Sequence, residues 1–134
     1  MILHFVVPGE PQAWQRAGRH GSRSFNPAEM AQAQKAVRQY ADLAIREIKV
    51  KDPALWAAYP CSGPFTLRCG FHLGIDARGR KRDCDLDNLL KNVMDALRGL
   101  VWHDDIQVRM LMGAKYLASP QPRTVISAGP LETE

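Results

Sequence analysis

The sequence has few cysteines. The three that are present, Cys61, Cys69 and Cys84, are odd in number and include no CxxC pair. A disulfide framework of the kind found in small secreted proteins is therefore not expected, and a reducing cytoplasm is the simplest location. A zinc site built from these cysteines with His72 stays conceivable, although their spacing matches no structural zinc pattern.

Long apolar runs are also missing. No stretch approaches the ~20 apolar residues that span a membrane, and no basic segment precedes the short apolar stretch at the N-terminus. Neither a transmembrane helix nor an export signal is expected. Repeats and low-complexity tracts are absent too. With 134 residues, of which 46% are hydrophobic, the sequence predicts one soluble domain, residues 1–134, with one packed core.

Positive charge is in excess, with a formal net charge of +4 and a pI near 9.2. This balance favours an anionic partner such as nucleic acid. The basic residues gather in two segments that are predicted to be loops. One segment contains Arg16, Arg19 and Arg23, and the other contains Arg78, Arg80, Lys81 and Arg82. Solvated loops would explain both groups, but the second lies directly before several aspartates, which favours DNA contact.

Hydrophobic periodicity predicts an α+β fold. Alternating or β-branched segments indicate strands, and an apolar stripe at helical spacing indicates helices. Strands are expected at 2–7, 64–73, 106–118 and 121–128, and helices at 27–48, with Asn26 as N-cap, and at 87–99. The predicted architecture is a mixed β-sheet of about four strands, with two main helices packed on one face.

The stretch around residue 85 carries the clearest chemical signal. A single aspartate at a helix start is most simply an N-cap, and Asp87 fits that role, with Gly99 ending the helix. Asp85, however, lies two residues earlier, in a segment that is expected to be extended. Its side chain can therefore point the same way as that of Asp87. Two converging carboxylates repel each other unless a cation intervenes, which favours a divalent metal ion.

Two further features could belong to the same site. Lys91 lies one turn after Asp87, where it could form an ordinary salt bridge or stabilise charge on a phosphate group. The pair Asp104-Asp105 could be a surface turn or could supply a third carboxylate.

These residues together resemble a known family. The run Asp85-Leu86-Asp87-Asn88-Leu89-Leu90-Lys91, followed by Asp95-Ala96-Leu97 and Asp104-Asp105-Ile106-Gln107-Val108, is similar to the signature of the RusA family of Holliday junction resolvases. Members of that family are small bacterial and phage-encoded endodeoxyribonucleases that act as homodimers with magnesium. The similarity is strongest over residues 81–108 and extends more weakly to Val7-Pro8-Gly9 and the basic segment after it.

The resemblance implies roles for particular residues. Asp85, Asp87 and Asp105 would be catalytic, metal-binding carboxylates, Asp104 a neighbouring ligand, and Lys91 an essential helper. The implied metal is Mg²⁺, with Mn²⁺ as a substitute, and the implied partner is branched DNA bound by the basic segments. Asp83 and Cys84 depart from the family pattern. The expected function is resolution of four-way DNA junctions by paired symmetric nicks, in recombination and repair, by a cytoplasmic homodimer.

Other interpretations stay open at this level. The protein could bind DNA through its basic loops without cleaving it, or could be a regulatory domain that responds to a metal ion. Three separated acids favour the enzyme, because a pure DNA binder gains affinity by losing negative charge near phosphates. His103 is a candidate general base, and Trp14 and Trp102 could stack on unpaired bases or simply pack. Candidate dimer contacts are Val108, Leu111 and Leu117, or an exposed part of the 64–73 strand, although each of these residues could equally be ordinary core.

Overall fold

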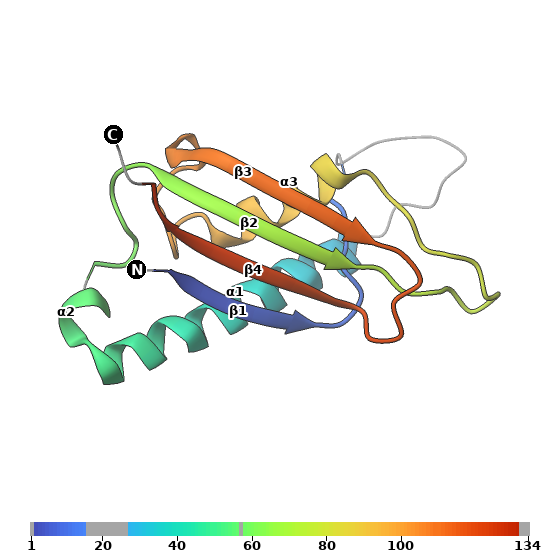
Figure 1. Ribbon diagram of the computed structural model, residues 1–134, viewed down its shortest axis with the longest axis horizontal. Coiled ribbons are helices and arrows are strands. Elements are labelled where there is room, and N and C mark those ends of the chain that lie inside the picture. Colours follow the sequence, from blue (N-terminus) through green and yellow to red (C-terminus); the bar gives the residue numbers. More distant parts are fainter. Residues whose placement is uncertain (1, 16–26, 57, 132–134) are drawn as a thin grey trace.

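The computed structural model describes residues 2–15, 27–56 and 58–131 (Figure 1). The helices are α1 (Pro27–Lys51), α2 (Pro53–Trp56) and α3 (Leu86–Leu97), with a 3-10 turn, η1, at Asp105–Gln107. The strands are β1 (Leu3–Pro8), β2 (Phe65–His72), β3 (Val108–Tyr116) and β4 (Arg123–Pro130).

The four strands form one mixed sheet in the order β1-β4-β2-β3. β4 pairs antiparallel with both β1 and β2, whereas β2 and β3 are parallel. Parallel neighbours need a crossover connection, and α3 lies within it. The connection therefore takes the chain from the C-terminal end of β2, back along α3, to the start of β3 (Figure 1). The predicted α+β class and four-stranded sheet are confirmed.

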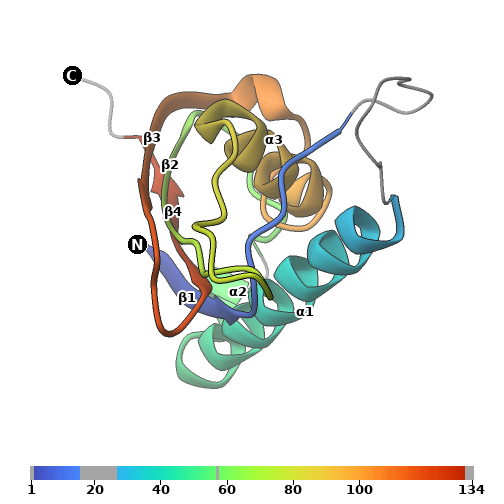
Figure 2. The ribbon, with the colours of Figure 1, turned by 90° about the vertical axis from the view of Figure 1, so that its right-hand side faces the viewer.

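Both long helices cover the same face of the sheet (Figure 2). Alternation along the strands turns one set of side chains toward them: Leu3, Phe5 and Val7 in β1 are buried, and their neighbours are exposed. Trp102 is fully buried against Phe65, with ring centroids 5.8 Å apart and edge to face. Trp102 is thus a core residue and is not available to stack on DNA bases.

The apolar face of α3 packs closely against the edge strand β3. Its apolar side chains, among them Leu89, Leu90 and Val93, are buried. Leu90 packs directly over Gly113 of β3, where a β-carbon would lie 2.9 Å from the Leu90 Cδ1. The absent side chain at Gly113 lets α3 approach the edge strand closely, which fixes the helix that carries the candidate aspartates.

Several element ends differ from the sequence prediction. The prediction that Asp87 caps the second long helix is wrong: the helix begins at Leu86, and the N-cap position belongs to Asp85. The predicted end at Gly99 fits better, since α3 ends at Leu97 and Gly99 has a φ of 81°. The predicted start of a strand at 106 falls inside η1. Asn26, the predicted cap of α1, lies outside the described residues.

Within the described part of the chain, no helix combines the length and the apolar character needed to cross a bilayer.

Candidate active site

Asp85 and Asp87 stand at the N-terminal end of α3, and both side chains are exposed. Asp85 has extended backbone, with φ −65° and ψ 130°, and its carboxylate makes no capping hydrogen bond. Asp87 Oδ1 accepts the backbone N–H of Asn88 over 2.9 Å. Neither carboxylate has a cationic partner among the described residues, so both are available to a divalent cation.

A basic hairpin, residues 74–82, leads into this pair of aspartates (Figures 1 and 2). Asp76 organises the hairpin, because its Oδ1 accepts the backbone N–H groups of Arg78 and Arg80, each over 2.9 Å. These hydrogen bonds, led by the one from Arg80, lower the pKa of Asp76. Gly79 turns the chain with a φ of 78°, a conformation that glycine adopts at little cost.

The basic side chains of the hairpin are not equivalent. Arg80 Nε is bound to Asp76 Oδ2 at 2.9 Å, and Arg82 Nε lies 3.7 Å from Glu10 Oε1. Arg78 and Lys81 are exposed, and neither forms an ion pair with any residue that the structure describes. Arg78 and Lys81 are therefore the two hairpin residues best able to take a phosphate without breaking an existing contact.

Two residues that were not singled out from the sequence hold this region in place. Glu10 accepts the backbone N–H of Gly74 on both carboxylate oxygens, at 3.1 Å each. Lys115 of β3 donates to Asp83 Oδ1 at 2.7 Å and to the Cys84 carbonyl at 2.8 Å. The hydrogen bond from Lys115 lowers the pKa of Asp83. Asp83 thereby belongs to the support of the loop, outside the pair that could hold a metal ion.

Lys91 follows Asp87 by one helical turn, but no ion pair between them is found in the described structure. Its Nζ lies instead over the ring of Trp14, 3.5 Å from the ring centroid. Lys91 is exposed and lies one helical turn from Asp87, so its ammonium group is accessible to an anion.

Asp104 and Asp105 lie elsewhere. Asp104 is the N-cap of η1: its side chain accepts the Ile106 N–H over 3.2 Å, in a capping box with Gln107. Asp105 accepts the Trp102 Nε1–H over 2.9 Å and lies 3.4 Å from a guanidinium nitrogen of Arg98. Arg98 is the C-cap of α3, whereas Asp85 is its N-cap.

The three proposed carboxylates do not converge within one chain. The 12 residues of α3 separate Asp85 from Asp105 by roughly 18 Å at 1.5 Å per residue. Consistent with this, no group of three or more His, Cys, Asp and Glu side chains that could hold a metal ion exists among the described residues. The described part of a single chain therefore provides two of the expected carboxylates at one end of α3 and the third at the other end.

The predicted DNA-binding residues Arg16, Arg19 and Arg23 lie outside the described residues. His103 is exposed in the turn before η1, where its backbone N–H donates to Gln107 Oε1 over 2.8 Å.

Two exposed carboxylates beside a basic hairpin and a lysine are a site suited to a phosphate-bearing substrate. The family described as endodeoxyribonuclease RusA matches residues 8–128 of the 134-residue chain. The chain belongs to this RusA endodeoxyribonuclease family, whose members act on Holliday junctions. No match to a curated protein was found.

The hairpin geometry gives a first prediction. Replacing Arg78 and Lys81 together by Ala should weaken junction binding. The slope of log K against log salt concentration should become shallower by about 0.9 per lost phosphate contact. Binding measured by fluorescence anisotropy over a salt series tests this. Arg46→Ala on α1, where Arg46 is already paired with Asp42 at 3.0 Å, is the control. An unchanged slope in the double variant would show that the hairpin does not contact phosphates.

Proposed function

We propose that the protein is a metal-dependent endonuclease that resolves four-way DNA junctions by paired symmetric nicks, in recombination and repair. The main support for this proposal is the pair of exposed carboxylates, Asp85 and Asp87, which have no cationic partner in the described part of the chain and lie beside the basic hairpin. Membership of the RusA family supports junction DNA as the substrate. The hairpin supplies electrostatic attraction for the phosphodiester chain, and the aspartates supply the reactive end of the site.

The proposed cofactor is Mg²⁺, with Mn²⁺ as a substitute. Exposed carboxylate oxygens are the donors that these hard cations prefer, so Asp85 and Asp87 fit the group. A bound ion would supply the Lewis acid and the activated water that phosphodiester hydrolysis needs. Lys91, one turn along α3, would stabilise negative charge that develops on the phosphoryl oxygens.

A second copy of the chain would complete the site. Because Asp105 lies at the far end of α3 from Asp85, one chain cannot bring all three carboxylates to one ion. A two-fold axis that reverses the direction of a neighbouring chain would place Asp105 of the partner subunit at the Asp85 end. The homodimer is therefore proposed as a requirement of the site as well as of the symmetric substrate.

The edge strand β3 is the proposed interface. No strand among the described residues pairs with its outer edge, and Met110, Leu111 and Met112 are 43%, 45% and 49% exposed in succession. An apolar, unprotected edge strand is a template for pairing with another strand, and soluble proteins usually protect such edges with charge or a cover. Among the three sequence candidates for dimer contacts, Leu111 and Leu117 are exposed and Val108 is half-buried.

Antiparallel pairing of two β3 strands has the required geometry. If the whole strand pairs symmetrically, Val108 lies opposite Tyr116 of the partner subunit, and Met112 lies opposite its own copy. Lys115, near the end of β3, is bonded to Asp83 and to the Cys84 carbonyl. The start of one β3, preceded by Asp105, would thus lie near the partner's Asp85 and Asp87.

The direct test is cleavage of an end-labelled four-way junction by the purified protein. With Mg²⁺ the expected products are linear duplexes with nicks at matching positions in two opposed strands, and EDTA should abolish them. A linear duplex of the same sequence should stay intact. Tight junction binding without any cleavage in Mg²⁺ or Mn²⁺ would favour the alternative, a noncatalytic DNA-binding protein.

A further inference from the structure

Lys91 rests on an aromatic ring supplied by a distant part of the sequence. Its ammonium nitrogen lies 3.5 Å from the centroid of the Trp14 ring. A lysine over the face of an indole is attracted by the negative face of the ring system. Among the described residues Lys91 has no carboxylate partner, so this contact is the one that restrains its charged end.

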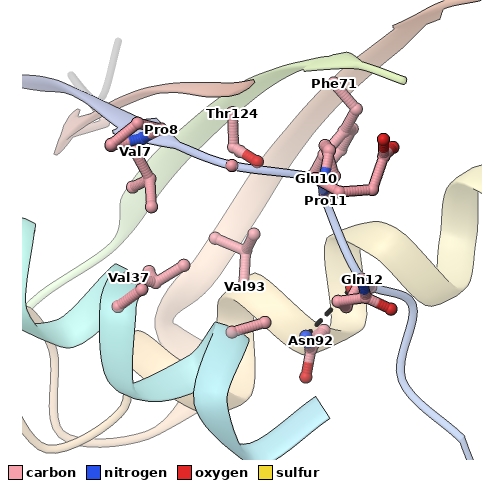
Figure 3. Close-up of a pocket in the computed structure, with 13 residues that line it drawn as sticks. Val7, Pro8, Glu10, Pro11, Gln12, Val37, Phe71, Asn92, Val93 and Thr124 are labelled. Atoms are coloured by element: carbon pink, nitrogen blue, oxygen red, sulfur yellow. Dashed lines mark hydrogen bonds between the residues drawn. The ribbon is translucent and has the colours of Figure 1, made fainter. Parts of the chain in front are cut away.

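Backbone contacts fix the ring to the same helix. The Trp14 N–H donates to the Asn88 carbonyl over 2.9 Å. One turn later, Asn92 Nδ2 donates to the Gln12 carbonyl over 2.9 Å, a bond drawn in Figure 3. Segment 12–14 therefore runs along α3 and is attached to it at Asn88 and Asn92. Lys91 lies between these two residues of the helix.

The attachment through Asn92 is buried. Asn92 is only 3% exposed, and its Oδ1 accepts from Gln34 of α1 over 2.7 Å. Residues 7–12, which lead into this segment, line a small cavity of about 40 Å³ beside α1 and α3 (Figure 3). A buried amide with both functional ends bonded has one orientation, because reversing it would leave donors facing donors. The position of segment 12–14 on α3 is thus specified by the core.

The lysine gains order from this arrangement. A lysine side chain carries its charge on a flexible four-carbon stem and loses much rotamer freedom when it is held in one place. If the side chain is ordered before substrate binds, its conformational entropy has already been lost when charge develops on the phosphate. A neutral ring is suited to this role because, unlike a carboxylate, it leaves the positive charge of the lysine uncompensated.

We infer that Trp14 is a positioning residue for catalysis, which holds the Lys91 ammonium group over its ring, one helical turn along α3 from Asp87. This inference rests on the proposed function. It assigns to Trp14 a role in the rate of the chemical step, in place of base stacking on DNA.

The kinetic test uses single-turnover junction cleavage at saturating enzyme, together with separately measured binding. Trp14→Leu should lower the cleavage rate by about two- to fivefold, the rate equivalent of an exposed cation–π contact, with unchanged junction affinity. Trp14→Phe, which keeps an aromatic face, should recover most of that loss. In a Lys91→Ala background, Trp14→Leu should have no further effect, since the group that it positions is gone.

A second readout is independent of activity. In protein with ¹³C-labelled lysine, the ε-methylene protons of Lys91, identified by their absence in Lys91→Ala, should be shifted upfield by the indole ring current. The shift should disappear in Trp14→Leu. An ordinary lysine shift in the wild-type protein would show that the contact does not persist in solution and would overturn the inference.

Other outcomes separate this inference from the proposed function. If the wild-type protein cleaves but Trp14→Leu lowers the cleavage rate by the same factor in the presence and in the absence of Lys91, Trp14 acts independently of Lys91. If the loss lies wholly in junction affinity, Trp14 contacts DNA. Either result overturns the inference and leaves the nuclease proposal standing, whereas a wild-type protein without cleavage would overturn both.

Discussion

Asp85→Asn and Asp87→Asn, made singly, should each abolish junction cleavage while leaving junction binding intact or tighter. Each change removes one negatively charged carboxylate. The described residues of one chain offer only two such carboxylates at this site. Removing a residue that only hydrogen-bonds to a metal ligand typically lowers metal affinity or activity by about 10–100-fold. Loss of a direct ligand should therefore lower the cleavage rate by roughly a hundredfold or more. Binding should persist because the basic hairpin is untouched and a negative charge near phosphate is lost.

Two matched substitutions control for the loss of a surface carboxylate. Asp83→Asn retains an oxygen that can accept from Lys115 and the Cys84 N–H, so it should keep most of its activity. Asp42→Asn removes a carboxylate on α1 that pairs with Arg46, and it should cleave normally. Near-normal cleavage by both Asp85→Asn and Asp87→Asn would remove the metal site from the proposal.

The second large effect is expected at the free edge of β3. Met112→Asp should convert the homodimer to monomers and remove cleavage with it. In the proposed pairing Met112 lies opposite its own copy, so two carboxylates would face each other across the two-fold axis, where like charges destabilise strand pairing. The chain itself should still fold, because Met112 is 49% exposed. Light scattering should give the 15.0 kDa chain mass in place of twice that value.

Charge complementation makes this test specific for the interface. Met112→Lys should also be monomeric and inactive, but an equal mixture with Met112→Asp should form mixed dimers that recover cleavage. Val50→Asp, at the 84%-exposed Val50 near the end of α1, is the control for adding an acid to an apolar surface position. A fully active, dimeric Met112→Asp protein would place the interface elsewhere.

The parts of the fold that the sequence predicts well are those determined by local periodicity. The apolar positions of α3, such as Leu89 and Val93, repeat at helical spacing and are buried, and the alternation in β1 and β2 places every second side chain in the core. The cap of α3 was misassigned because Asp85 and Asp87 are equally good capping residues by type. Which of them occupies the N-cap depends on where the extended chain from the hairpin first turns helical.

The sequence predicts only part of the arrangement of the candidate site residues. The spacing of Asp85, Asp87 and Lys91 can be read locally: the two aspartates lie at the N-terminal end of α3, and Lys91 follows Asp87 by one helical turn. The position of Asp105 depends on the direction of β3 in the sheet, which spacing alone does not reveal. Contacts between distant segments, such as Lys115 with Asp83 and Trp14 with Lys91, carry no local signal for the same reason.

Mixing two inactive variants tests whether each active site is shared between two chains. Asp85→Asn and Asp105→Asn should each be inactive alone. If each site takes Asp85 from one chain and Asp105 from the other, a mixed dimer contains one site with both substitutions and one site with neither. Random exchange of an equal mixture makes about half of the dimers mixed, so about a quarter of the wild-type number of sites should work.

The measurement is nicking of an end-labelled junction by this mixture after subunit exchange. If the site is shared, nicking should reappear, and each mixed dimer should cut one strand without resolving the junction in a single step. Recovery would also show that Asp105→Asn folds, although Asp105 accepts a hydrogen bond from Trp102. A mixture that contains mixed dimers yet remains as inactive as its components would contradict a site shared between two chains.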